Sequence, residues 1–323
     1  MRRITILAIV LVIIVGGWSA AWLYASKLIR DNVAQLADAD GQTTPKLVCD
    51  RLDIGGYPFW FDVSCGNLTV TQGDLSANVP EVRASLLVYD PFHVVGIATG
   101  PLSYADAFTG SKRRLDWKTL EASARLTGWR IARISIVADS PVLTNTIGGD
   151  VLIGKASHAE LHLLDIPEQY DAAKGMAGLA LYAKTDDINA PGIQINDGMS
   201  TLEADISGLS DDIRTYGDLN AIRRWQVAGG KIKLVGLKGS DGAQDVGVVG
   251  TLGLDDKMRP EGQLTVDSKG LVERVSGMVP EQWRPIIIGN PGPDGSYHEV
   301  LNFTNGLAFS GVVPLGAVPP LLP

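Results

Sequence analysis

The chain opens with a long uncharged segment and continues with shorter stretches in which apolar and polar residues alternate. From Ile4 to Ala25 no residue carries a charge. At about 1.5 Å per residue, this segment would form a helix of roughly 33 Å, enough to cross a bilayer core of about 30 Å. The pattern therefore predicts a transmembrane helix over residues 4–25.

Two interpretations of this segment compete. A cleaved signal peptide has a shorter apolar region, of about 7–15 residues, and ends in a small-x-small site. Ser19-Ala20-Ala21 would serve as such a site. However, Trp18, Trp22 and Tyr24 gather near the far end of the run, and Trp and Tyr are enriched where a helix meets the headgroups. We therefore favour an uncleaved signal anchor over a cleaved signal peptide.

The flanking residues predict the topology. Arg2 and Arg3 precede the run, and the positive-inside rule then puts residues 1–3 in the cytoplasm. Helical spacing continues past the run, which predicts a stalk helix over residues 26–40. The chain is expected to be a single-pass protein of the inner membrane with its ectodomain in the periplasm.

Alternation with a period of two residues recurs through the ectodomain. It is clearest in four stretches, residues 82–89, 120–127, 158–163 and 202–207. This period is typical of antiparallel strands with one covered and one solvated face. Helices are expected to be few, at residues 218–225 and 269–279.

A weak internal similarity suggests a division of the ectodomain. Trp129-Arg130-Ile131 and Trp225-Gln226-Val227 each precede an apolar stretch with strand character. We therefore expect a first sheet unit over residues 41–215 and a second over residues 216–323, both belonging to one ectodomain.

The two cysteines, Cys49 and Cys65, flank a segment with the pattern of a hairpin. Strands over residues 47–54 and 59–65 would be joined by a turn whose centre, Tyr57, is equally distant from both cysteines. Residues facing each other in such a register lie about 4.5–5.5 Å apart, close to disulfide reach. We predict a disulfide, which would persist in an oxidising compartment; two buried free thiols are the alternative.

The second strand of this hairpin carries the densest aromatic cluster. Phe59, Phe61 and Val63 alternate on one face and are expected to line an apolar groove or the core. Trp60 faces the opposite way, which would put it at a groove rim, near the membrane surface, or under a neighbouring loop.

The charge balance restricts the partners. The first 30 residues hold four of the 28 basic residues and none of the 36 acidic ones, so residues 31–323 carry a formal charge of −12. An ectodomain this acidic argues against nucleic acid and against electrostatic docking on anionic lipids, since both depend on Lys and Arg. It leaves apolar contact with lipid tails open.

One segment has the composition of a metal site. On a strand, His158, Glu160 and His162 would share one face, and two His with a carboxylate are suitable ligands for zinc or copper. A solvated polar strand face explains the same residues equally well, and the glutamate does not follow the first His as in a metalloprotease helix. We expect no metal and no cofactor.

No motif identifies a reaction. The sequence lacks the Gly-x-Ser-x-Gly elbow, the dinucleotide fingerprint and the P-loop pattern. We therefore expect that the protein is not an enzyme, with an unrecognised anchored hydrolase as the remaining alternative.

Several separated motifs together resemble a known family. Gly56-Tyr57-Pro58-Phe59 lies between the cysteines, and the later segments are Gly250–Asp255, Arg259–Gly262, Gly311–Gly316 and Val318–Leu321. Their order resembles the uncharacterised Gram-negative envelope family called domain of unknown function 2125, over nearly the whole chain. No catalytic residues carry over from this family.

That family is similar in turn to the AsmA-like envelope proteins. The resemblance implies a mainly β fold, with an N-terminal transmembrane helix followed by a long, curved antiparallel sheet and a few short helices. It also implies an apolar groove that binds or moves lipid or another apolar ligand. The large AsmA-like proteins have far longer sheets that could span the periplasm. An ectodomain of this size is not expected to span it, so the resemblance does not imply a sheet that carries lipid the whole way across. The alternative is a structural protein that docks envelope partners without a ligand groove.

Overall fold

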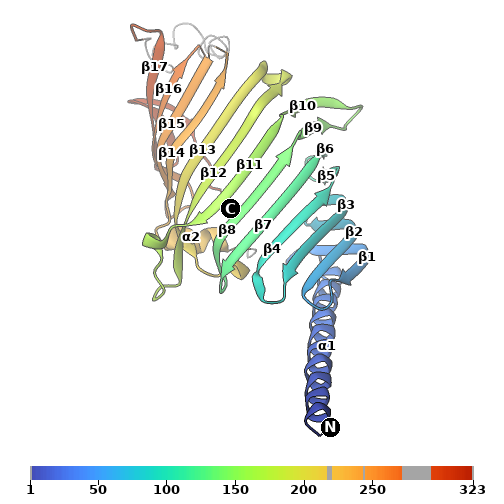
Figure 1. The fold of residues 1–323 in the computed structure, drawn as a ribbon. Helices are drawn as coiled ribbons and strands as arrows, with labels where there is room; N and C mark the ends of the chain where they lie inside the picture. Colours follow the sequence, from blue (N-terminus) through green and yellow to red (C-terminus); the bar gives the residue numbers. More distant parts are fainter. Residues whose placement is uncertain (1, 217–219, 243, 271–291, 322–323) are drawn as a thin grey trace. The chain divides into compact units, whose positions relative to one another are not determined.

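The computed structural model describes residues 2–216, 220–242, 244–270 and 292–321 (Figure 1). The fold is mainly β, with one long N-terminal helix, a large antiparallel sheet and a few short helices. This confirms the predicted fold class. The second predicted helix, at residues 269–279, lies outside the described residues from residue 271 onward.

The helix α1 (Arg2–Ala37) leads from the N-terminus to the first strand (Figure 1). It contains both the predicted transmembrane run and most of the predicted stalk. By length and composition it can cross a membrane, and among the described residues it is the one helix that meets this criterion.

The described chain forms two compact units. The first extends to Ser123 and includes residues 141–153, and the second comprises residues 124–140 and everything from residue 154 onward. The predicted border near residue 215 therefore lies inside the second unit. The strands on either side of that border, β13 and β14, pair directly, so both belong to one sheet. Trp129 precedes a strand whereas Trp225 lies in a helix, so their sequence similarity has no structural counterpart.

The first unit is an antiparallel sheet of hairpins. Its strands are β1 (Lys46–Gly55), β2 (Trp60–Gln72), β3 (Leu75–Leu87), β4 (Asp90–Thr99), β5 (Leu102–Asp106), β6 (Lys112–Asp116), β9 (Val142–Asn145), and parts of β7 (Thr119–Thr127) and β10 (Val151–Lys155). β2 pairs with β1 and β3, and β3 pairs along its length with both β4 and β5. β9 pairs with β6, and this pairing joins residues 141–153 to the first unit.

The second unit is a meander. Its further strands are β8 (Arg130–Asp139), β11 (His158–Asp165), β12 (Met176–Ala190), β13 (Ile195–Ser210), β14 (Ile232–Asp241), β15 (Gln244–Leu254), β16 (Pro260–Lys269), β17 (Ser296–Thr304), β18 (Leu307–Ser310) and β19 (Val313–Ala317). β11 pairs with β8 and β12, and from β12 each strand pairs with the next. The short helices are η1 (Pro167–Gln169), η2 (Pro191–Ile193), η3 (Ile213–Thr215) and α2 (Ala221–Val227).

The four alternating stretches of the sequence fall in or overlap β3, β7, β11 and β13, as predicted. Few side chains are fully buried, because most lie on a sheet face that remains partly exposed. The buried apolar residues of the described chain are Phe61, Cys65, Ile131, Ala177, Leu179, Ala204 and Met258.

Cys49 and Cys65 form the predicted disulfide, with their Cα atoms 5.4 Å apart. The register of the hairpin differs from the prediction by three residues, because Cys49 pairs with Leu68 and Cys65 with Leu52. The residues between the last paired positions are 56–61, which moves the centre of the connection past Tyr57. The backbone explains this shift, because the N–H groups of residues 59 and 60 both bond to the Gly56 carbonyl and close the turn there.

Candidate functional site

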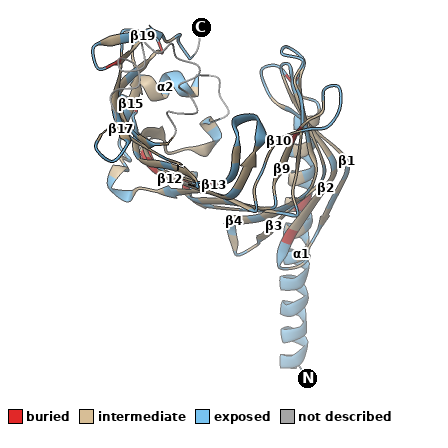
Figure 2. Cartoon of the chain, turned by 90° about the horizontal axis from the view of Figure 1, so that it is seen from above, coloured by how far each residue is buried: buried red, intermediate tan, exposed pale blue. Residues whose placement is uncertain are grey.

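The second unit contains a largely apolar pocket of about 600 Å³. Apolar side chains from the sheet form one wall, and residues of α2 and the C-terminal segment form the other. The main apolar lining residues are Met176, Ile206, Ile222, Trp225, Ile232 and Leu321. Figure 2 shows α2 on the concave side of the strands β12 to β19 of this unit.

Two hydrogen bonds to backbone carbonyls position α2, one to the sheet strand β13 and one to the short helix η3. The indole N–H of Trp225 donates to the Ser207 carbonyl at 2.7 Å, and Arg224 Nη2 donates to the Thr215 carbonyl at 3.0 Å. Ile222 and Trp225 are three positions apart and therefore project from the same side of the helix. Both line the pocket.

Glycines allow this close packing. A Cβ on Gly230 would overlap the indole nitrogen of Trp225, and a Cβ on Gly208 would lie 2.8 Å from the Cα of Gly230. Gly208 also has φ of +73°, a conformation that favours glycine. Because Gly208 and Gly230 have no side chain, the segments before and after α2 can lie close to the helix.

Five polar residues also line the pocket. They are Lys174, Ser210, Thr215, Tyr216 and Arg224. The Tyr216 hydroxyl donates to the Ser210 carbonyl at 2.9 Å. Burial raises the pKa of Tyr216, and the charge of Asp211 raises it further. The tyrosine therefore stays a neutral hydrogen-bond donor. The positively charged lining residues are Arg224 and Lys174, whose Nζ lies 3.2 Å from Asp171 Oδ2.

Replacing Gly230 with alanine is expected to displace Trp225 and to shrink or distort the pocket. The new methyl group occupies the place of the indole ring, so the bond from Trp225 to Ser207 has to break. Tryptophan fluorescence of the full-length protein should change in intensity and wavelength. Gly236→Ala is the control, because a Cβ there meets no atom within 4 Å; an unchanged spectrum for Gly230→Ala would contradict the packing.

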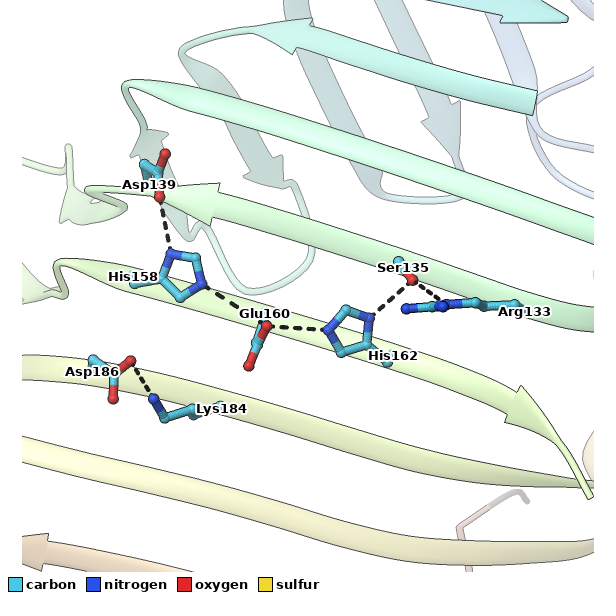
Figure 3. A network of polar contacts seen from close by, with 8 residues as sticks. All are labelled: Arg133, Ser135, Asp139, His158, Glu160, His162, Lys184 and Asp186. Atoms are coloured by element: carbon cyan, nitrogen blue, oxygen red, sulfur yellow. Dashed lines mark hydrogen bonds and ion pairs between the residues drawn. The ribbon is translucent and has the colours of Figure 1, made fainter. Parts of the chain in front are cut away.

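The three residues of the possible metal site share one face of β11, as the strand assignment predicts (Figure 3). His162 Nε2 lies 3.2 Å from Glu160 and its Nδ1 lies 2.9 Å from the Ser135 hydroxyl, while His158 Nδ1 lies 2.9 Å from Asp139. The side chains thus form a hydrogen-bonded strip along β8 and β11. Over the described residues, no group of three or more His, Cys, Asp or Glu is arranged to hold a metal ion.

The predicted groove residues lie in the first unit and do not line the pocket. Phe61 is buried and Val63 is half-buried, both in β2. Phe59 lies in the turn before β2 and is 59% exposed, so it is not a core residue. Trp60 begins β2 and is 46% exposed.

Sequence reasoning missed the pocket, although one signal was present. The apolar positions Ile222 and Trp225 at helical spacing indicate one apolar face of a short helix. The other lining residues come from strands distant in sequence and from Leu321, whose N–H bonds to the Met258 carbonyl at 2.9 Å. Only the strand pairing brings these residues together.

The comparisons with known proteins give one match. A family model described as an uncharacterized protein conserved in bacteria (DUF2125) matches residues 22–319. No curated protein and no solved structure matches the chain. The similarity to AsmA-like proteins therefore stays a prediction.

Proposed function

Since the chain belongs to the DUF2125 family, whose members are uncharacterised, we propose a function from its own residues: it binds the acyl chain of a lipid in the apolar pocket beside α2. The observation that carries the proposal is the pocket itself. Ligand pockets are typically concave and mostly apolar, with volumes of about 300–1,000 Å³ and a few polar groups that orient the ligand. The pocket beside α2 has all of these properties.

The lining residues suit an amphipathic ligand. Ile206, Ile232 and Trp225 would contact an acyl chain, whose burial gains about 0.8 kcal/mol per CH₂ group. Arg224, together with Lys174 released from its ion pair with Asp171, would meet a negatively charged headgroup. The acidic ectodomain as a whole would keep the rest of its surface away from anionic lipids.

The proposed location supplies this ligand. We take α1 as an uncleaved single-pass anchor in the inner membrane, with the ectodomain in the periplasm. The disulfide supports the periplasmic placement, because disulfides persist in oxidising compartments. The anchor would keep the ectodomain attached to the membrane from which lipid is taken.

A photoreactive lipid tests the proposal on the full-length protein. The protein is reconstituted in phosphatidylcholine vesicles that contain a phospholipid with a diazirine near the end of its acyl chain. After illumination, cross-linked peptides are mapped by mass spectrometry. We expect labelling in α1, which serves as an internal control, and also in the pocket segments around Ile206 and Ile222.

A matched pair of variants makes the result specific. Ile206→Glu puts an unpaired carboxylate in the pocket, and we expect pocket labelling to fall at least about tenfold because such burial costs more than about 1.4 kcal/mol. Ile193→Glu is the control, since Ile193 is 65% exposed. Labelling of α1 without any labelling of the pocket would reject lipid binding there and favour the alternative, a structural protein that docks envelope partners.

A further inference from the structure

The turn between β1 and β2 exposes a cluster of aromatic side chains beside α1. This aromatic turn comprises residues 56–60. Tyr57 is 49% exposed, Phe59 59% and Trp60 46%. From residue 54 to residue 61 the chain carries no charge. Exposed apolar surface of this kind, concentrated in one turn, indicates an interaction site.

The aromatic turn is hydrogen-bonded to the apolar part of α1 itself. The indole N–H of Trp18 donates to the Pro58 carbonyl at 2.9 Å, and that of Trp22 donates to the Trp60 carbonyl at 3.2 Å. The ring of Trp22 also stacks on Phe61, with centroids 5.3 Å apart. The turn therefore lies alongside residues of α1 that precede its first charged residue after the apolar run, Lys27.

A third contact lies at the same level. The Ser19 hydroxyl donates to the Val15 carbonyl at 2.7 Å and lies 2.8 Å from the Tyr57 hydroxyl. The serine proton is used in the first bond, so the tyrosine donates to the serine. These bonds satisfy polar groups of α1 that would otherwise face hydrocarbon, where an unpaired donor is costly.

Distances along α1 give the depth of the turn. Trp22 lies five residues and Trp18 nine residues before Lys27, which corresponds to about 7 Å and about 13 Å along the helix axis. The headgroup region on each side of a bilayer is roughly 5–7 Å thick. With Lys27 at its outer edge, Trp22 lies at the boundary with the hydrocarbon and Trp18 several ångströms inside it.

The backbone of the turn is suited to this depth. Non-helical backbone is tolerated in a membrane only where its polar groups are paired within the protein. The Gly56 carbonyl accepts from the N–H groups of residues 59 and 60, and the Phe59 carbonyl accepts from Val88. The Pro58 and Trp60 carbonyls accept from the two tryptophans of α1, and Pro58 has no N–H group to satisfy.

We propose that the aromatic turn inserts into the bilayer leaflet on the ectodomain side, next to α1, with Phe59 in contact with lipid. The first unit is then held to the membrane at two points. A helix alone leaves the attached domain free to tilt relative to the membrane, whereas a second inserted point restricts that tilt. The inference takes the transmembrane placement of α1 from the proposed function but does not depend on the pocket.

Nitroxide labels on the full-length protein test the insertion. Phe59→Cys is labelled while the native disulfide stays oxidised, and the protein is reconstituted in vesicles of phosphatidylcholine with a minor fraction of phosphatidylglycerol. The matched control is Phe108→Cys, because Phe108 is also an exposed phenylalanine in a turn of the first unit, 86% exposed. Ile9→Cys, in the middle of the apolar run, reports the bilayer interior.

We expect the label at residue 59 to be accessible to oxygen. Its accessibility to a polar nickel chelate should be at least about tenfold lower than that of the label at residue 108, because moving a polar solute into hydrocarbon costs more than about 1.4 kcal/mol. Equal chelate access at residues 59 and 108, with residue 9 protected, overturns insertion and leaves the anchor in place. Chelate access at residue 9 as well would remove the anchor itself. Low access of both reagents to residue 59 would show contact with protein and also overturns the proposal.

A measurement on the unmodified protein guards against an effect of the label. A second photoreactive phospholipid, with its diazirine near the headgroup end of the acyl chain, should label the peptide that contains Phe59, whereas the peptide that contains Phe108 stays unlabelled. Absence of labelling at Phe59 overturns the proposal whether or not the pocket is labelled, so the two ideas fail separately.

Discussion

Reducing the Cys49–Cys65 disulfide is expected to lower the free energy of unfolding of the first unit by about 3 kcal/mol. The bond joins residues separated by 16 positions, and closing a loop of that length restricts the unfolded chain by about this amount. In the folded state the disulfide connects β1 and β2, the two strands that the aromatic turn joins. Loss of the disulfide should therefore also weaken the contacts between that turn and α1.

Hydrogen exchange measures this effect locally, because a protein with two units gives no single unfolding midpoint. Amides of β1 and β2 should exchange faster in the reduced protein, and amides of β12 and β13 should be unchanged. The double variant Cys49→Ser, Cys65→Ser should match the reduced protein. If only the double variant is destabilised, the loss comes from the buried hydroxyl at position 65 and not from the missing cross-link.

Replacing Gly250 with alanine is expected to destabilise the second unit by about 3 kcal/mol, from backbone strain and overpacking together. Gly250 has φ of +150°, and a Cβ there would overlap the Gln263 carbonyl oxygen and lie 2.8 Å from the Leu264 Cα. Both neighbours are backbone atoms of the paired strand β16, so neither can rotate away. The clash is relieved only by separating β15 from β16.

Gly247→Ala is the matched control for this variant. It lies in the same strand, and a Cβ there meets no atom within 4 Å. We expect Gly247→Ala to leave stability unchanged or to raise it slightly, since alanine restricts the unfolded chain more than glycine does. Urea unfolding followed by hydrogen exchange of β15 and β16 compares the two. Equal stability of both variants would show that β15 and β16 are not packed as described.

Local sequence patterns predicted the elements well, for a simple reason. A long uncharged apolar run is compatible with few structures other than a membrane-spanning helix. Alternation with a period of two is a property of the strand itself. The disulfide was also predicted correctly, although from a register that is wrong by three residues. The register could not be predicted from local spacing, because it depends on where the turn closes, and here the Gly56 carbonyl and the tryptophans of α1 set that point.

The division into units and the pocket could not be predicted from local patterns. Residues 141–153 join the first unit because β9 pairs with β6, a contact between segments about 30 residues apart. The pocket combines Met176, Ile222 and Leu321, which the sheet order brings to one place. Alternation shows that a side chain faces one side of a strand, but it does not show whether that side encloses a cavity.

The chain order of the strands also decides when each unit can be completed during synthesis. From β12 onward each strand pairs with the one directly before it in the sequence, so a chain synthesised N-terminus first can add one strand at a time, in order. The first unit has a different requirement, since β6 must wait for β9. Its sheet therefore stays incomplete until the start of the second unit has already been synthesised.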